Sequence, residues 1–253
     1  AASESQVKIR FGPILKEASS SGFFDLKGQL KLPNTQDRLR LVIESNGDSL
    51  VPENELDESS QQDNIVNSAL SSSFSAAIRF VRADMGADFD MGIRLAFPLD
   101  PFLRLHFQQG NDENAFAWWQ KQEMFAYYSD GVGARYGIGL SYKQSPSLQY
   151  STDFGVTWLD KDGLFYVREN FYIRHVINEK NRMSYQLSFL QSGEHNIQPD
   201  SFLYNFLYEH LLYKDWLIGQ VKPQFTHEAD NGYDAEASLT LSLAILLGPE
   251  YLH

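Results

Sequence analysis

Residues 132–143, which read VGARYGIGLSYK, alternate strictly between two kinds of side chain. The even positions carry Val132, Ala134, Tyr136, Ile138, Leu140 and Tyr142, and the odd positions carry glycine, serine, arginine and lysine. Successive side chains of a β-strand point to opposite faces of the sheet. The pattern therefore predicts a strand with one apolar face and one face that is small or polar.

The same alternation recurs along most of the chain. It is clear in residues 88–97, 148–158, 182–190 and 234–247, and the complete pattern predicts about fourteen strands. Most of the runs have about 9 to 15 residues, whereas strands in soluble proteins usually have about 5 or 6. A tilted strand that crosses a bilayer needs about 9 to 11 residues. Strand length therefore favours a membrane protein.

Composition excludes several classes of protein. The longest uncharged stretch near the C-terminus, residues 237–249, has about 13 residues and is too short for a membrane-spanning helix of about 20. The chain of 253 residues has no cysteine, which excludes disulfide scaffolds, thiol nucleophiles and cysteine-ligated metals. A net charge of −12 argues against a nucleic-acid partner bound through overall positive charge.

The predicted connections between strands alternate in kind. Tight turns are expected at residues 33–36, 144–147, 178–181 and 213–215; longer or Gly/Asp-rich loops are expected at 45–67, 129–131, 160–163, 192–200 and 228–232. Short turns at one rim and longer loops at the other are typical of outer-membrane barrels. We expect one transmembrane domain over residues 1–253, with a flexible N-terminus at 1–6, a long acidic loop at 46–67 and a C-terminal extension or tag remnant at 249–253.

The alternative is a soluble sandwich or barrel with its apolar faces turned inward. Fourteen long strands bearing several large apolar side chains each would enclose an interior too wide to fill. Aromatic residues also recur near the predicted strand ends, as the interfacial girdles of a membrane barrel require: Trp118, Tyr128, Tyr142, Tyr150, Trp158, Phe165, Phe202 and Tyr204. The fold class predicted is all-β, a closed antiparallel transmembrane β-barrel of 12–14 strands with short periplasmic turns and longer extracellular loops.

Three segments, residues 24–44, 92–107 and 211–225, resemble segments of uncharacterised porin-like β-barrel proteins from the outer membrane of Gram-negative bacteria. The resemblance covers most of the chain from Val7 onward. It implies the barrel fold, a location in the bacterial outer membrane, and contact with outer-membrane lipid and lipopolysaccharide. It implies no activity and assigns no functional residue.

If the apolar faces point outward, the charges of the lumen can be read from the sequence. About sixteen of the 21 basic residues would face inward, against about ten of the 33 acidic ones, so the lumen is basic by roughly six charges. Rings of Arg and Lys favour anions. The candidate solute-binding residues lining the lumen are Arg79, Arg94, Arg104, Arg135, Lys143, Arg168, Arg174 and Lys222. Pairing of these charges across strands is the alternative interpretation, and Asp88 and Asp90 near Arg94 suggest such a salt-bridged wall.

The bore of a barrel with 12 to 14 strands lies between the filled eight-stranded type and the open porins of 16 to 18 strands. The sequence leaves open whether it is closed by the bulky residues expected inside: Trp119, Phe125, Tyr127, Tyr166, Arg168 and Tyr172. Glu169 is an exception to the pattern, because strict alternation places it on the lipid face. A β-bulge at residues 168–170, or contact with a partner or an inward neighbour, would explain it.

Three functions compete. The leading one is a passive channel for small anionic or zwitterionic solutes, and the second is a non-conducting barrel that anchors or joins a cell-envelope complex. The third is a lipid-modifying enzyme that uses Ser192, Glu194 and His195, which share a predicted loop. The sequence has no Gly-x-Ser-x-Gly elbow and no His-Glu-x-x-His motif. We therefore predict no enzyme activity, no catalytic residue, no metal and no cofactor.

Overall fold

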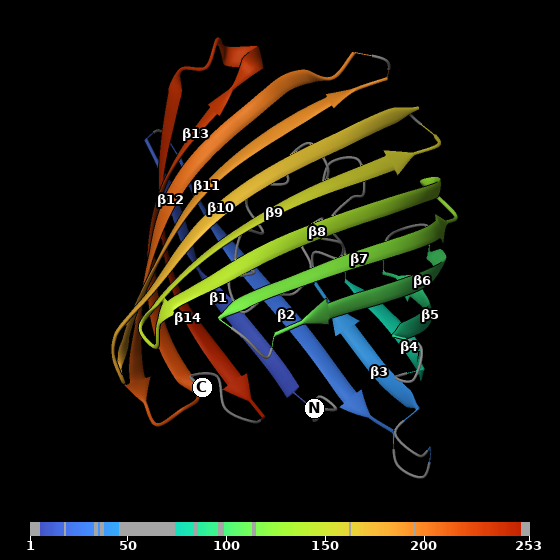
Figure 1. Ribbon diagram of the computed structural model, residues 1–253, viewed down its shortest axis with the longest axis horizontal. Helices are drawn as coiled ribbons and strands as arrows, with labels where there is room; N and C mark the ends of the chain where they lie inside the picture. Colours follow the sequence, from blue (N-terminus) through green and yellow to red (C-terminus); the bar gives the residue numbers. More distant parts are fainter. Residues whose placement is uncertain are drawn as a thin grey trace.

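The structure is a computed structural model that describes residues 6–17, 19–32, 35, 38–45, 74–82, 86–95, 99–112, 115–161, 163–194 and 196–248. The segments at 1–5, 46–67 and 249–253, for which specific roles were expected, lie outside these residues. Fourteen strands form one closed barrel (Figure 1). They are β1 (Gln6–Lys16), β2 (Ser20–Lys31), β3 (Leu39–Glu44), β4 (Ser75–Arg82), β5 (Ala87–Arg94), β6 (Asp100–Asn111), β7 (Phe116–Tyr127), β8 (Gly131–Ser145), β9 (Leu148–Leu159), β10 (Leu164–Asn178), β11 (Asn181–Gly193), β12 (Gln198–Tyr213), β13 (Leu217–Glu228) and β14 (Ala235–Leu247).

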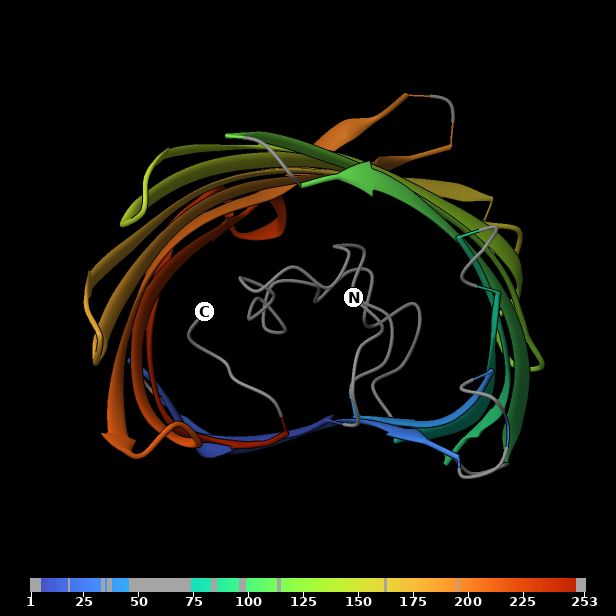
Figure 2. The same ribbon diagram turned by 60° about the horizontal axis from the view of Figure 1, so that its bottom comes forward.

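Each strand pairs antiparallel with its neighbours in sequence, and β1 pairs with β14 to close the ring. Figure 2 shows this ring of strands almost end on. A short 3₁₀ helix, η1 (Ala229–Asn231), lies between β13 and β14. Closure gives every strand two hydrogen-bonded neighbours, which is the condition for a sheet that contacts hydrocarbon. The predicted fold class is confirmed, with fourteen as the strand number.

The outer surface of the barrel is apolar and the inner surface polar. On β8, Leu140 is 57% exposed while Arg135, on the opposite face, is only 9% exposed. The same inversion holds on β5, where Met91 is 59% exposed and the carboxylate residue Asp90 is fully buried. A soluble barrel shows the opposite distribution, since water covers its outer face. The apolar faces therefore point outward, as the sequence predicts.

Among the described residues, no helix is long and apolar enough to cross a membrane.

Strand β1 begins and β14 ends at the lower rim in Figure 1, which we call the terminal rim; the opposite one is the loop rim. The two-residue turns 146–147 and 179–180 lie at the terminal rim, whereas connections 160–163 and 229–234 lie at the loop rim. Stacked aromatic rings lie near both rims. Phe116 stacks on Tyr142 at the terminal rim with ring centroids 4.5 Å apart, and His227 stacks on Phe202 near the loop rim at 4.3 Å. Such rings suit the two membrane interfaces.

Large rings cover glycines on the inner wall. Phe125 and Gly133 are directly paired between β7 and β8, and a side chain on Gly133 would collide with the ring. Trp119 covers Gly139 in the same way, and Phe102 of β6 covers Gly92 of β5. A glycine opposite an aromatic residue lets the ring lie flat against the sheet. The inward glycines of the sequence pattern therefore reflect a crowded wall.

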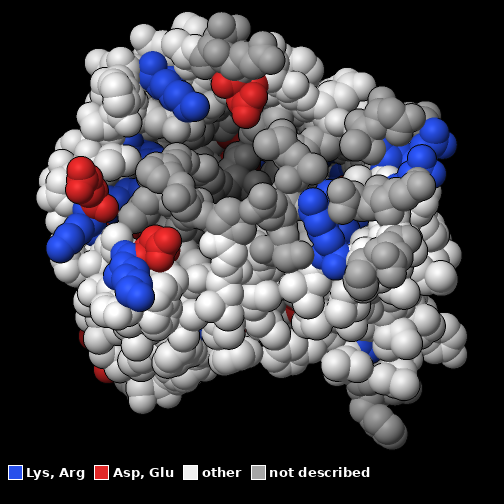
Figure 3. Space-filling view, turned by 90° about the horizontal axis from the view of Figure 1, so that it is seen from below, with Lys and Arg blue, Asp and Glu red and all other residues white. Residues whose placement is uncertain are grey.

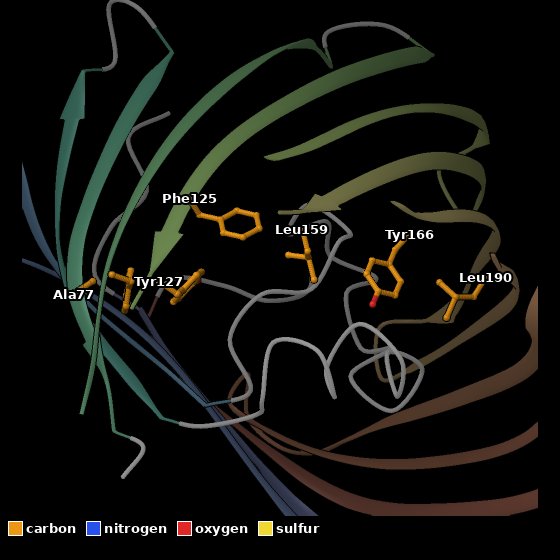
Figure 4. Packing of buried hydrophobic residues seen from close by; sticks show 7 residues of the cluster. Ala77, Phe125, Tyr127, Leu159, Tyr166 and Leu190 are labelled. Carbon is orange, nitrogen blue, oxygen red and sulfur yellow. The ribbon is translucent and has the colours of Figure 1, made fainter. Parts of the chain in front are cut away.

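Further apolar side chains point from this wall into the interior, as Figure 4 shows for Phe125, Tyr127, Leu159 and Tyr166. They belong to one buried cluster with Ala77, Phe102 and Leu190. The inward positions expected for Tyr172, 6% exposed, and Arg168, 2% exposed, are also confirmed.

Glu169 keeps the regular register of β10. It pairs with Phe154 of β9 and Phe189 of β11, and the described pairings shift only near the terminal rim, between Val176 and Asn178. A bulge at residues 168–170 is therefore the wrong explanation. The carboxylate lies on the outer face, midway along an otherwise apolar run from Phe165 to Ile173.

Glu169→Leu is expected to raise the free energy of unfolding by about 1–2 kcal/mol, because the apolar side chain suits hydrocarbon at this depth. The measurement is urea-induced unfolding of the barrel in lipid vesicles. Glu179→Leu, at the exposed turn between β10 and β11, is the control and should change stability by less than about 0.5 kcal/mol. A lower stability for Glu169→Leu would show that the carboxylate has a polar neighbour it needs.

Candidate solute site in the barrel lumen

Asp90 is the centre of an ion-pair network on the inner wall. Its carboxylate accepts two hydrogen bonds from Arg79, at 2.7 Å from Nε and 2.9 Å from Nη2. Nη2 of Arg104 lies 3.1 Å away and Nε2 of His106 lies 3.2 Å away. The three partners come from β4 and β6, the two strands that flank β5. Asp90 is thus enclosed by basic side chains.

The network continues along the sheet in both directions. His106 Nδ1 lies 2.8 Å from Glu123 of β7, whose other oxygen accepts a 3.0 Å hydrogen bond from Arg135 of β8. At the other end, Arg104 lies 3.6 Å from Glu44 of β3. We call these residues the β3–β8 charge network; they are Glu44, Arg79, Asp90, Arg104, His106, Glu123 and Arg135. Its charges alternate, so each holds its neighbours in place.

Arg94 belongs to a separate group at the loop rim. It pairs with Asp100 and Asp130 and donates a 2.8 Å hydrogen bond to the Ser129 hydroxyl. Arg94 and Asp90 are thus both salt-bridged, as expected for a salt-bridged wall, but to other residues and not to each other. The reason is register: four residues along one strand span about 13 Å, whereas Arg94 lies directly opposite Asp100 on the next strand.

Three of these arginines also stack on aromatic rings. The guanidinium carbon of Arg94 lies 4.2 Å from the ring centre of Tyr127, and that of Arg135 lies 4.6 Å from the Phe125 ring. Arg104 covers the ring of Phe102 at 4.7 Å. A guanidinium over a ring face gains electrostatic attraction while its edge remains available for carboxylates. The guanidinium groups of the arginines on β5, β6 and β8 are thus held at their edges by carboxylates and on one face by an aromatic ring.

The eight predicted solute-binding residues occupy different parts of the lumen. Arg79, Arg104 and Arg135 belong to the β3–β8 charge network and Arg94 to the separate group at the loop rim; each is paired with a carboxylate. The other four are Lys143, exposed near the terminal rim on β8, Arg168 and Arg174, both on β10, and Lys222 on β13. Arg168 and Lys222 are 2% and 7% exposed. The structure therefore does not bring all eight together as one ring of cations.

A second polar layer crosses β9–β12. Asn170 donates a 2.7 Å hydrogen bond to Asp153 and receives one from Ser188. Ser188 in turn accepts from Gln186, which accepts a 3.0 Å hydrogen bond from Asn205. The ladder crosses four strands at a similar level of the wall. A buried chain of side chains that hydrogen-bond to one another is rigid. This one therefore fixes the positions of its side chains on the inner wall.

A cavity of about 310 Å³ lies against β13 and β14, the strands that follow this layer, and against the adjoining β1 and β2. Its lining includes Gln220, Lys222 and Gln224 of β13 and Ser238, Thr240 and Ser242 of β14. We call it the β13–β14 cavity. Apart from Lys222, the sequence analysis did not assign these residues to a site. Their inward phase on two consecutive strands was the available signal, since alternation places all six on one face.

Charged groups of both signs surround the central hollow seen from the terminal-rim side (Figure 3). Within the described strands, inward-facing Lys and Arg outnumber inward-facing Asp and Glu.

The residues considered for catalysis are only partly described. Ser192 lies near the end of β11 and Glu194 follows that strand, while His195 lies outside the described residues. In the part of the chain that the structure describes, no group of three His, Cys, Asp or Glu side chains is placed to hold a metal ion.

Comparisons support the fold. The sequence matches no family model and no curated protein. Among solved structures, a loop-deletion mutant of OmpT, an outer membrane protein of Vibrio cholerae, is 5% identical with a TM-score of 0.56, covering 96% of this chain and 98% of that one. The outer membrane channel DcaP of Acinetobacter baumannii is 10% identical with a TM-score of 0.54, covering 96% of each chain. At these identities the likeness shows the fold alone. Together with the apolar outer surface, it supports a closed transmembrane β-barrel with the fold of bacterial outer-membrane barrels.

Proposed function

We propose that the barrel is a passive channel for small anionic or zwitterionic solutes, surrounded by outer-membrane lipid and lipopolysaccharide. The observation that carries the proposal is the excess of inward Lys and Arg in a chain whose net charge is −12. Fixed positive charge along a narrow aqueous path attracts anions and repels cations. The paired arginines of the β3–β8 charge network contribute little net charge. Basic residues on other strands, among them Arg168 and Lys222, add further inward positive charge.

A second candidate is a non-conducting barrel that anchors a cell-envelope complex. It is favoured by the crowded wall of β4–β11, where the aromatic cluster and the buried ion pairs occupy space that a wide pore would need. The outward carboxylate of Glu169 would then mark the side that contacts the partner. No enzymatic role is proposed; of the residues considered for catalysis, Ser192 and Glu194 lie at and just after the end of β11, and His195 lies outside the described residues.

Recordings from single barrels in planar bilayers test the proposal. Under a potassium chloride gradient, we expect a chloride-to-potassium permeability ratio above one, which falls roughly twofold in the double variant Arg168→Gln, Lys222→Gln because both side chains carry inward charge. Lys180→Gln, in the exposed turn between β10 and β11, removes one charge outside the lumen and should leave the ratio unchanged. Absence of conductance at every voltage would exclude a channel, and a preference for potassium would exclude the argument from lumen charge.

A further inference from the structure

The β13–β14 cavity has an ordered sequence of polar groups along its length. On β13, Gln220, Lys222 and Gln224 point into it in turn, and on β14 each lies opposite a hydroxyl residue. The direct partners are Ser242 for Gln220, Thr240 for Lys222 and Ser238 for Gln224. Toward the loop rim, Glu228 and Glu236 also line the cavity. Lys222 and Arg10 of β1 place positive charge deeper in the cavity. Lys16 of β1, paired with Ser238, lies near the outer end with the two glutamates, so that end carries a net negative charge.

One buried group in this cavity needs a donor. Gln224 is 4% exposed, and its Nε2 donates a 3.1 Å hydrogen bond to Thr226 Oγ1. Its Oε1 is fully enclosed and accepts no hydrogen bond from any residue that the structure describes. A buried acceptor without a hydrogen-bond partner costs free energy. A ligand that brings an N–H or O–H to this oxygen recovers that free energy.

The spacing of the charges sets the length of a suitable ligand. Lys222 lies opposite Thr240, and Glu236 lies four residues from Thr240 on β14, a separation of about 13 Å along the strand. Two residues of an extended peptide span about 7 Å, and the lysine and glutamate side chains can cover the rest. The amides and hydroxyls between the two ends can donate to and accept from a peptide group.

From this arrangement we propose that the β13–β14 cavity is a binding site for a small peptide zwitterion of about two residues. Its carboxylate lies at Lys222, and its ammonium group lies near Gln224 Oε1 and the carboxylates of Glu228 and Glu236. The proposal rests on the channel function above and names a solute class for it. The site would hold the solute within the lumen between the two rims.

Binding is measured by equilibrium dialysis of radiolabelled L-alanyl-L-alanine against the purified barrel in detergent micelles. Two analogues serve as controls: the N-acetyl dipeptide lacks the ammonium group, and the dipeptide amide lacks the carboxylate. Because a hydrogen bond to a charged group contributes about 1.5–3 kcal/mol, each analogue should bind at least about tenfold more weakly. Neither analogue requires a variant that might fail to fold.

Two variants locate the site. Lys222→Met should weaken dipeptide binding at least about tenfold and make the dipeptide and its amide equivalent, while Gln224→Leu should weaken the dipeptide more than its N-acetyl form. The matched controls are Lys180→Met and Gln144→Leu, at exposed positions of the terminal rim, which should bind like the original protein. Equal binding of the dipeptide and its N-acetyl form would overturn the zwitterion site.

The outcomes for the site and for the channel are separable. A barrel that conducts ions but binds no dipeptide overturns the site and leaves the channel standing. A barrel that binds the dipeptide with the stated preferences but conducts no ions supports the site and overturns the channel.

Discussion

Replacement of Asp90 by alanine is expected to lower the free energy of unfolding by about 3–5 kcal/mol, because it breaks a buried ion pair from one side. Asp90 is fully buried and accepts hydrogen bonds from both Nε and Nη2 of Arg79. Arg104, itself 4% exposed, lies 3.1 Å away. Without the carboxylate, both guanidinium groups stay in the wall with like charges facing each other. Urea titration of the barrel in lipid vesicles, followed by tryptophan fluorescence, measures the loss.

Asp88→Ala is the matched control for this effect. Asp88 faces the lumen two residues earlier on β5 but is partly exposed, so its removal should cost less than about 1 kcal/mol. Asp90→Asn preserves the shape and one acceptor, and it should fall between the two alanine variants. Equal losses for Asp88→Ala and Asp90→Ala would show that the β3–β8 charge network does not stabilise the wall.

The features that sequence analysis predicted correctly depend on local periodicity. Alternation at Val132–Lys143 requires only that neighbouring side chains point to opposite faces, so one strand's own sequence shows its apolar side. The lengths of the runs then separate membrane strands from soluble ones. The predicted range of 12–14 strands followed because the runs are separated by turn residues, such as those at 144–147 and 178–181. Each of these signals is contained within about fifteen residues.

The alternation of side chains could not predict which residues of neighbouring strands form ion pairs with each other. Alternation predicts that Arg79, Arg94 and Arg104 face inward, but their partners depend on how far each strand slides against the next. A shift of two residues would preserve every face and exchange the ion pairs. The β13–β14 cavity was missed for the same reason, since its volume depends on the neighbouring side chains of several strands. Electrostatic properties of the lumen therefore require the register as well as the faces.

The seam at which β1 pairs with β14 to close the barrel is sensitive to substitution at Gly12. A Cβ atom on this residue would overlap the carbonyl oxygen of Leu241 and lie 2.8 Å from Cα of Ser242, both in the backbone of β14. Backbone atoms within a hydrogen-bonded sheet cannot move aside as a flexible side chain can. Gly12→Ala is therefore expected to lower the free energy of unfolding by about 3 kcal/mol or more. The strain is released by separating β1 from β14, which exposes two unpaired strand edges to hydrocarbon.

Gly28→Ala provides a control with the opposite sign. The nearest atoms to a Cβ on Gly28 are Val7 Cγ2 at 3.7 Å and the Ile43 carbonyl oxygen at 3.8 Å, which is ordinary contact. Alanine there restricts the unfolded chain without strain, so stability should rise by about 0.4–1 kcal/mol. Both variants are compared by urea unfolding in vesicles and by the mobility of unheated protein on a denaturing gel. If Gly12→Ala is as stable as Gly28→Ala, then β1 and β14 do not approach each other closely at this seam, because the same added methyl group would otherwise stabilise one strand and open the other.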